Sequence, residues 1–377
     1  MTRGRYATIA MTILGVLILA GCATAVPTAT EPPAAPGPIA TTTAPPPAGA
    51  EAPRRLDIAC NDLGSPGALA GVLASPVTSQ NPARIALAAF SGMPYSYFVE
   101  QAGGIECLWS DGAPASSVTG GGSSASASIA VLPDAAAGWA QYQREYGITS
   151  DMDVNCRIND GDGCQFDALV GTSWIEANIG RLSTAPISDT VASSAAATYF
   201  AHVSAVVRDA HSLPPAPHPA TSVGCDRLIS PSDFAALLGV SGPLSFGYPG
   251  GGDSIEFTGA AQVGETRCLV NLAGSDDGVG LVDVLPGAAW AARELRPLAI
   301  LPSTPTNVTV TGLAAGEFST IRYNAGTGEA VLDFTLRGDW VEVMLYPSSE
   351  GGVTVSGDVR AKLATVAAKI VDNLTAD

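Results

Sequence analysis

Lysine and histidine are almost missing from this 377-residue chain, which has only two lysines and three histidines. The formal net charge is −17. Nucleic-acid binding needs basic patches on a protein surface, so this composition makes DNA and RNA poor partners. An acidic balance favours cationic ligands weakly, and net charge alone identifies no particular ligand.

Catalytic and nucleotide-binding motifs are also missing. The chain has no Gly-x-Ser-x-Gly elbow, no His-Glu-x-x-His helix and no phosphate-binding loop. We expect the three histidines, His202, His211 and His218, to be solvated. The cysteines lack zinc-ligand spacing and have no neighbouring histidine. These absences predict a protein with no catalytic residues, metal or cofactor, and one that is not an enzyme.

The only long hydrophobic run covers residues 9–20, after Arg3 and Arg5. It is about half the ~20 residues that a membrane-spanning helix needs. The run ends in Leu-Ala-Gly-Cys at residues 19–22, which is typical of a secretory signal peptide with a lipobox-type cleavage site. The pattern resembles bacterial lipoproteins, and this resemblance implies that Cys22 is diacylated and becomes the new N-terminus. An ordinary secreted protein with an incidental Cys22 is the alternative.

Cleavage would remove residues 1–21 as a lipoprotein signal peptide. Two acyl chains anchor a protein stably where one is marginal, so we expect the chain on the extracytoplasmic face of the cell membrane. Residues 22–54 are rich in proline, threonine and alanine. Such a stretch cannot bury a core and tends toward extended polyproline II, so we expect a disordered tether.

The remaining chain consists of two similar halves. We call residues 55–211 the first repeat and residues 222–377 the second repeat, with a proline-rich linker at residues 212–221. Several landmarks recur in the same order, about 160 residues apart. They are a first cysteine (Cys60, Cys225), a second cysteine (Cys107, Cys268), Val-Leu-Pro (131–133, 284–286) and a tryptophan (Trp174, Trp340). A period of this size is that of a domain, so the pattern indicates tandem duplication.

Local signals in both repeats predict an α+β fold. Ser65 and Ser230 are good helix N-caps, and each precedes a proline at the first helical position. Closing helices are predicted at residues 189–210 and 358–374. Strands are predicted at residues 128–132, 281–285, 330–336 and 340–346. We therefore expect two tandem homologous domains, each an antiparallel sheet faced by helices.

Disulfides are expected to staple each repeat. Six cysteines remain after Cys22, and in an exported protein we expect them to be oxidised to disulfides. Because the repeats are duplicated, we expect the cysteine pairs that occur in both repeats to form bridges. The two remaining cysteines, both in the first repeat, then form a third pair. The predicted bridges are Cys60–Cys107, Cys225–Cys268 and Cys156–Cys164.

One aromatic stretch is a candidate binding surface. Met93, Tyr95, Tyr97 and Phe98 lie in a segment with glycine and proline, and loops rich in tyrosine and phenylalanine are typical of binding surfaces. The stretch has no evident apolar match in the second repeat. An edge strand that packs on its own repeat is the structural alternative.

Two glutamates occupy equivalent places after tryptophans. Glu176 and Glu342 are candidates for acid–base work, but they lie in different repeats, so we expect a solvated sheet face. The tryptophans themselves are expected in the core. They are Trp109, Trp139, Trp174, Trp290 and Trp340.

Taken together, the lipobox, the tether and the paired cysteine units resemble actinobacterial cell-envelope lipoproteins with domains of unknown function. The resemblance implies small α+β domains outside the membrane and supplies no catalytic residues. We expect a non-catalytic binding or accessory module, held to membrane lipid through Cys22, whose partner is an envelope protein or wall polymer. The alternatives are a carrier of a small apolar or amphiphilic ligand in a sheet–helix cleft, and an extracytoplasmic hydrolase. Converging polar groups with shifted pKa values would favour the hydrolase.

Overall fold

The structure is a computed structural model of the chain. It describes residues 51–73, 75–81, 93–111, 124–157, 162–182, 189–214, 223–247, 253–275, 278–295, 305–324, 328–346, 355 and 357–376. Cys22, the signal peptide and most of the predicted tether lie outside these residues. In the described part no helix is both long and apolar enough to cross a membrane.

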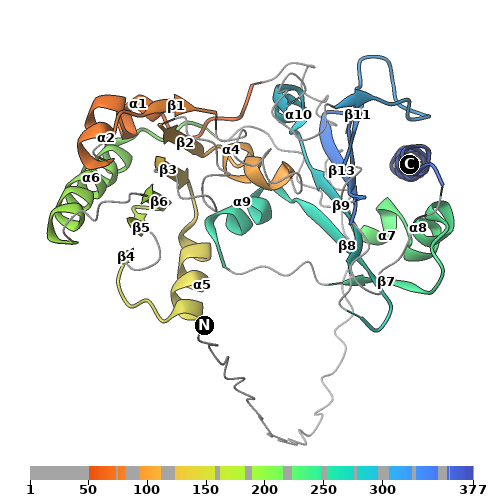
Figure 1. The fold of residues 1–377 in the computed structure, drawn as a ribbon, viewed down its shortest axis with the longest axis horizontal. Helices are drawn as coiled ribbons and strands as arrows, with labels where there is room; N and C mark the ends of the chain where they lie inside the picture. The colour runs from red at the N-terminus through yellow and green to blue at the C-terminus, as the bar shows by residue number, and fades with distance from the viewer. Residues whose placement is uncertain are drawn as a thin grey trace, which may run out of the picture. The chain divides into compact units, whose positions relative to one another are not determined.

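Each repeat contains one antiparallel sheet with helices, as the sequence predicts (Figure 1). The described strands of the first repeat are ordered β1-β2-β3-β6-β5-β4. Those of the second are ordered β10-β11-β12-β13-β9-β8-β7. Taken from β7 to β10, this order is the arrangement of the first repeat with one added edge strand, β10. The shared strand order supports a common origin for the two repeats.

The strands of the first repeat are β1 (Thr78–Gln80), β2 (Ile105–Ser110), β3 (Ser124–Leu132), β4 (Met152–Arg157), β5 (Asp162–Val170) and β6 (Ser173–Leu182). Those of the second are β7 (Leu244–Gly247), β8 (Thr266–Leu272), β9 (Gly278–Leu285), β10 (Thr306–Asn307), β11 (Ser319–Tyr323), β12 (Ala330–Leu336) and β13 (Asp339–Leu345).

The helices of the first repeat are α1 (Cys60–Leu63), α2 (Pro66–Leu73), the 3-10 helix η1 (Met93–Tyr97), α4 (Phe98–Gln101), α5 (Ala136–Tyr146) and α6 (Asp189–Asp209). Those of the second are α7 (Cys225–Leu228), α8 (Pro231–Leu238), α9 (Ile255–Val263), α10 (Ala289–Leu295) and α11 (Val359–Thr375).

Local chemistry explains where several helices begin. The Ser230 hydroxyl accepts a hydrogen bond from the Asp233 backbone N–H at 3.0 Å, and the Ser65 hydroxyl accepts one from Ala68 at 3.2 Å. Both contacts satisfy N–H groups that have no partner within the first helical turn. The two predicted N-caps are therefore confirmed. The predicted closing helices are also confirmed, as α6 and α11.

One face of each sheet packs against the closing helix of its own repeat. In the first repeat, Phe166 of β5 stacks on Phe200 of α6 with ring centroids 4.6 Å apart. In the second, Phe334 of β12 belongs to the same buried cluster as Val366 and Ile370 of α11. The period-two alternation of the strands sends the intervening side chains to the opposite face.

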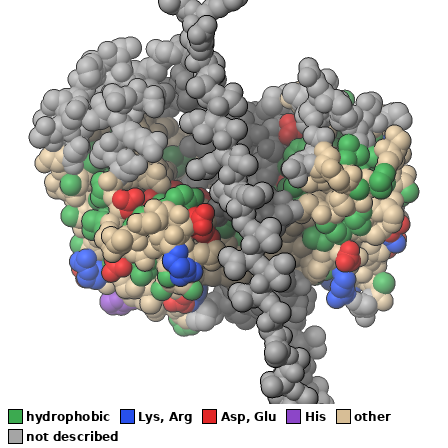
Figure 2. All heavy atoms as spheres, turned by 90° about the horizontal axis from the view of Figure 1, so that it is seen from below, with side chains coloured by type: hydrophobic (Ala, Val, Ile, Leu, Met, Phe, Trp, Pro, Cys, Tyr) green, Lys and Arg blue, Asp and Glu red, His purple; other side chains and the backbone are tan. Residues whose placement is uncertain are grey.

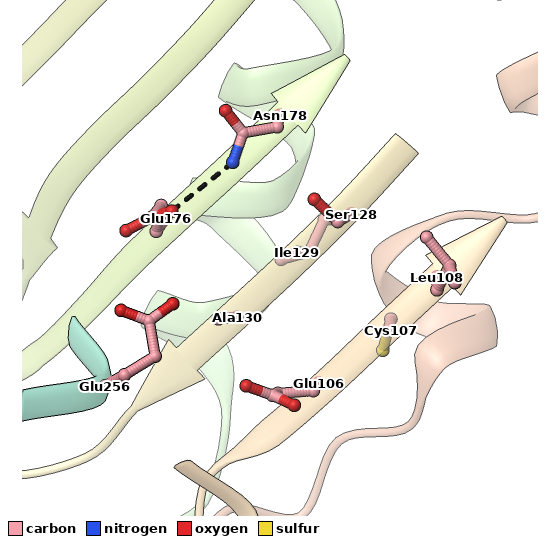
Figure 3. A pocket seen from close by; sticks show the side chains of 9 residues that line it. All are labelled: Glu106, Cys107, Leu108, Ser128, Ile129, Ala130, Glu176, Asn178 and Glu256. Atoms are coloured by element: carbon pink, nitrogen blue, oxygen red, sulfur yellow. Dashed lines mark hydrogen bonds between the residues drawn. The ribbon is translucent and has the colours of Figure 1, made fainter. Parts of the chain in front are cut away.

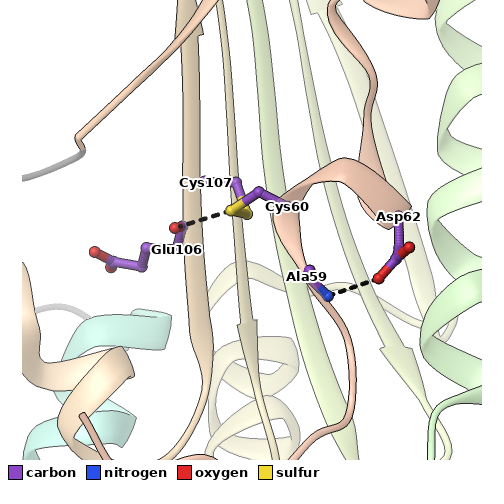
Figure 4. Close-up of a disulfide and its surroundings, with 5 residues drawn as sticks. All are labelled: Ala59, Cys60, Asp62, Glu106 and Cys107. Carbon is purple, nitrogen blue, oxygen red and sulfur yellow. Dashed lines mark hydrogen bonds between the residues drawn. A yellow bond between two sulfur atoms is a disulfide. The ribbon is translucent and has the colours of Figure 1, made fainter. Parts of the chain in front are cut away.

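Disulfides join the first helix of each repeat to its second strand (Figure 4). Cys60 bonds to Cys107 and Cys225 bonds to Cys268, so two predicted pairs are present. Cys164 of β5 is also disulfide-bonded. Its register partner on β4 is Cys156, whose side chain lies outside the described residues.

Each repeat has a buried core of its own, and the two repeats also share a third buried cluster. One buried cluster draws side chains from both of them. It includes Tyr97, Phe98, Trp139 and Trp174 of the first repeat, and Ile255, Val263, Trp290 and Trp340 of the second. All five tryptophans of the chain are buried, as predicted.

The short helices α4 and α9 pack against each other at this interface. The two helices cross closely at Gly259 of α9. A Cβ atom at this position would lie only 3.1 Å from the backbone C and O atoms of Phe98. Gln101, at the end of α4, donates to the Pro286 carbonyl oxygen at 2.7 Å. Gln262 of α9 donates to the Pro133 carbonyl oxygen at 3.0 Å, which makes the contact reciprocal.

Replacing Gln101 by alanine is expected to destabilise the protein by about 2–3 kcal/mol, measured by chemical denaturation. The Gln101 amide is buried, and its oxygen also accepts from the Trp290 indole N–H at 2.7 Å. The substitution would therefore leave two buried polar groups without a partner. Gln262→Ala is the matched control, because Gln262 is half-buried and should cost less. Equal losses for the two variants would contradict this account.

Candidate binding site

Positions in the two repeats correspond when they are counted from the second cysteine, Cys107 or Cys268. The reciprocal glutamines support this count, because each stands six residues before its cysteine. The same count pairs Glu106 with Arg267, Phe98 with Gly259, and Tyr95 with Glu256. The interface between the repeats has two equivalent places, which we call crevices. Each crevice is built from the sheet of one repeat and a helical segment of the other.

One crevice contains a cavity of about 200 Å³, which we call the acidic pocket (Figure 3). Its lining residues are Glu106, Cys107, Leu108, Ser128, Ile129, Ala130, Glu176, Asn178 and Glu256. Two rows of register partners across β2, β3 and β6 form its floor. They are Glu106–Ala130–Glu176 and Leu108–Ser128–Asn178.

Three carboxyl groups surround Ala130 in this pocket (Figure 3). Glu106 and Glu176 come from the sheet of the first repeat, whereas Glu256 comes from α9 of the second. The Asn178 amide donates to Glu176 Oε1 at 3.3 Å. No lysine or arginine is among the described residues that line the pocket.

The electrostatics of the acidic pocket favour protonated carboxyl groups. Burial, with the negative charges of Glu256 and Asp167, raises the pKa of Glu176 to about 8. Burial, with the charges of Glu100, Glu256 and Glu176, raises the pKa of Glu106 well above its ordinary value. A cation that entered the pocket would relieve both effects.

Asp167 of β5 extends the same row of the sheet, as the register partner of Glu176. Burial raises its pKa to about 6, although hydrogen bonds from Tyr142 and Gln165 lower it. The Tyr142 hydroxyl donates to Asp167 Oδ2 at 3.3 Å, and the Gln165 amide donates to the same oxygen at 3.0 Å. Asp167 thus adds negative charge behind the pocket without lining it.

The corresponding crevice of the second repeat is occupied by an arginine side chain. We call it the arginine site, and it consists of Arg267, Asp283, Glu342, Tyr95 and Phe98. The Arg267 guanidinium contacts Asp283 Oδ2 through Nη2 at 2.8 Å and Nε at 3.1 Å. Its Cζ lies 5.6 Å from the ring centroid of Tyr95 and 5.4 Å from that of Phe98, which is cation–π distance.

A second arginine adds positive charge on that face. Arg322 Nη2 lies 2.9 Å from Asp333 Oδ2 and 3.2 Å from Glu342 Oε2. Burial still raises the pKa of Glu342 despite this partner. In the first repeat the register position of Arg322 is Asn155, so neither arginine has a counterpart there.

Smaller side chains leave the cavity in the first repeat. Ala130 stands where the arginine site has Asp283, and Gly259 stands where it has Phe98. In the second row, Ser128 and Asn178 take the places of Leu281 and Met344, which are buried. The two crevices share one architecture, but only the arginine site is filled by its own chain.

The aromatic candidates are not a free binding loop. Residues 93–101 are helical, so the edge-strand alternative is wrong. Tyr97 and Phe98 are buried against the second repeat, where Tyr97 packs on Trp290 and Trp340 with ring centroids 5.6 and 5.7 Å away. The segment also has a counterpart, α9, contrary to the sequence analysis. The side chain of Met93 lies outside the described residues.

Tyr95 is the one aromatic candidate next to the acidic pocket. Its ring contacts that of Phe257 at a centroid distance of 5.8 Å. Burial, with the charge of Glu256, raises its pKa to about 12. Tyr95 therefore interacts with Glu256, which lines the acidic pocket, and with Arg267 of the arginine site.

The predicted solvated face for Glu176 and Glu342 is wrong for Glu342, which is fully buried. Glu176 is half-buried in the pocket wall. Glu106 and Glu256 are not among the site residues predicted from the sequence. Aligning the two repeats at their second cysteines would have identified Glu106. In that alignment Glu106 corresponds to Arg267, so the charge at this position differs in sign between the repeats.

Other features of the described residues identify no competing site. Acidic and basic side chains are interspersed on the described surface seen in Figure 2, so charge on that face marks no docking area. Within the described ranges no group of three or more His, Cys, Asp or Glu residues is placed to hold a metal ion. Comparison with protein-family models, curated proteins and solved structures gave no match.

Proposed function

We propose that this chain is a lipoprotein on the extracytoplasmic face of the cell membrane that acts as a non-catalytic binding module. Its ligand site would be the acidic pocket, and its ligand would carry positive charge. One observation carries the proposal: Glu106, Glu176 and Glu256 converge from two repeats on an open cavity with no cationic side chain among its lining residues. The lipobox pattern at residues 19–22 supports the membrane location.

Other ligands and activities fit less well. An apolar ligand is disfavoured, because the cavity is about 200 Å³ and three of its nine lining residues are glutamates. Typical sites for drug-sized ligands occupy about 300–1,000 Å³. Hydrolysis remains the second candidate, since two carboxyl groups with raised pKa values are a basis for acid–base chemistry. Turnover of an uncharged glycoside or ester that depends on Glu176 would favour it.

Cation binding is expected to weaken as the pH falls below about 8. A cation prefers ionised carboxylates, and the pKa of Glu176 is about 8 before ligand enters. Binding should therefore release protons, and the affinity should fall by up to about tenfold per pH unit below that value. Calorimetric titration of the detergent-extracted full chain with organic amines, from pH 5.5 to 9, measures this dependence. An affinity that rises on acidification would contradict the proposed site.

Membrane anchoring makes a separate prediction. Substitution of Cys22 by alanine should abolish incorporation of labelled fatty acid and release the protein from the membrane fraction. The binding of cations by the released protein should not change, because the pocket residues belong to the folded repeats. Unchanged labelling of Cys22→Ala would refute the lipoprotein assignment and leave the pocket unaffected.

A further inference from the structure

The arginine site shows which chemical group this architecture holds when it is occupied. Both crevices present carboxyl groups from the strands of one sheet and side chains from a helical segment of the other repeat. In the second repeat the occupant is the guanidinium of Arg267, held by Asp283 and Glu265. In the first repeat the same place is a cavity.

The shape and chemistry of the acidic pocket suit a flat, multivalent donor. A guanidinium group offers five N–H donors in a plane, which match several carboxylate oxygens at once. Glu106 and Glu176 approach from the sheet and Glu256 from α9, so donors on different edges of the group would each meet a carboxylate (Figure 3). A cavity of about 200 Å³ has room for a group of side-chain size.

Competing cations fit this arrangement less well. Divalent metal ions such as calcium and magnesium need several oxygen ligands within about 2.0–2.6 Å of the ion. The described carboxylates form no such group. An alkylammonium is a compact point charge with three donors, so it offers the three glutamates fewer N–H groups than the five of a guanidinium.

We propose that the acidic pocket binds a guanidinium group, since the equivalent place in the second repeat is occupied by the guanidinium of Arg267. The inference rests on the proposed function, since it names the ligand class of the same site. The group is an arginine side chain of a partner or a small free guanidine compound, and both share this chemistry. Glu106, Glu176 and Glu256 are its expected contacts.

The test is calorimetric titration of the detergent-extracted full chain at pH 8.5. The probes are methylguanidinium, N-acetyl-arginine amide, an Arg-containing tripeptide, N-acetyl-lysine amide and calcium chloride. We expect guanidinium probes to bind about tenfold or more tightly than the lysine amide. Methylguanidinium against the tripeptide then distinguishes a small free ligand from a protein side chain.

Variants locate the binding. Glu176→Gln and Glu256→Gln should each weaken guanidinium binding by about tenfold. Glu145→Gln, which removes the same charge from the exposed surface of α5, should leave it unchanged. Circular dichroism confirms that each variant is folded, and Glu256→Gln replaces Glu176→Gln if that variant is not.

The outcomes separate the two proposals. If lysine amide or calcium binds as tightly as the guanidinium probes and Glu176→Gln weakens that binding, the guanidinium inference fails and the cation pocket stands. If no probe binds, or if both pocket variants bind like the wild type, the inference and the proposed ligand site fail together.

Discussion

Replacing Glu106 by arginine is expected to convert the acidic pocket into a copy of the arginine site. The new guanidinium would stand at the position of Arg267, beside Glu176 and Glu256. It should fill the cavity, pair with both carboxylates and abolish the binding of added guanidinium compounds. It should also lower the pKa of Glu176, which the wild-type surroundings raise to about 8.

The same substitution should remove a pH dependence of stability. In the wild type the pKa of Glu176 lies above its ordinary value of 4.5, so the folded state binds a proton more tightly than the unfolded state. This contribution is fully present below about pH 4.5 and is lost as the pH rises toward 8, by at most about 1.4 kcal/mol per pH unit. In the Glu106→Arg variant the new arginine pairs with Glu176 and lowers its pKa, so this loss of stability with rising pH disappears.

Urea denaturation at two pH values measures the effect. Glu106→Arg should be more stable than the wild type by about 3 kcal/mol at pH 8 and differ little at pH 5. Glu106→Gln is the matched control, because it removes one like charge without supplying a cation and should produce a smaller gain. A Glu106→Arg variant that is less stable than the wild type at pH 8 would show that the two crevices are not equivalent.

The features that depend on neighbouring residues could be predicted from the sequence. Ser65 and Ser230 cap helices through contacts three residues away, and α11 follows from the periodicity of its own apolar side chains. The disulfides followed from repetition, since the pair Cys60 and Cys107 recurs in the same order, with a similar separation, as Cys225 and Cys268.

The acidic pocket could not be predicted in the same way, because it depends on two long-range arrangements. The first is strand register, which places Glu106 and Glu176 in one row through Ala130 although they are 70 residues apart in sequence. The second is the crossing of α4 and α9, which brings Glu256 to the sheet of the other repeat. The absence of a side chain at Gly259 permits that close crossing, and no local pattern indicates it.

Removing either inter-element disulfide should cost about 4 kcal/mol of unfolding free energy in the chain-entropy account. The two bridges close loops of similar length, with sequence separations of 47 for Cys60–Cys107 and 43 for Cys225–Cys268. The double variants Cys60→Ala/Cys107→Ala and Cys225→Ala/Cys268→Ala should therefore lose similar stability in urea denaturation.

Their effects on ligand binding should differ. Cys107 lines the acidic pocket, and Cys60 Sγ lies 3.5 Å from the carbonyl oxygen of Glu106, so the first bridge holds the strand that presents this carboxylate (Figure 4). Its loss should weaken guanidinium binding by about tenfold in titrations under conditions where the variant remains folded. The Cys225–Cys268 bridge lies beside Arg267, in the other crevice, and its loss should leave that affinity unchanged. Equal weakening in both variants would mean that binding reports global stability and not the position of Glu106.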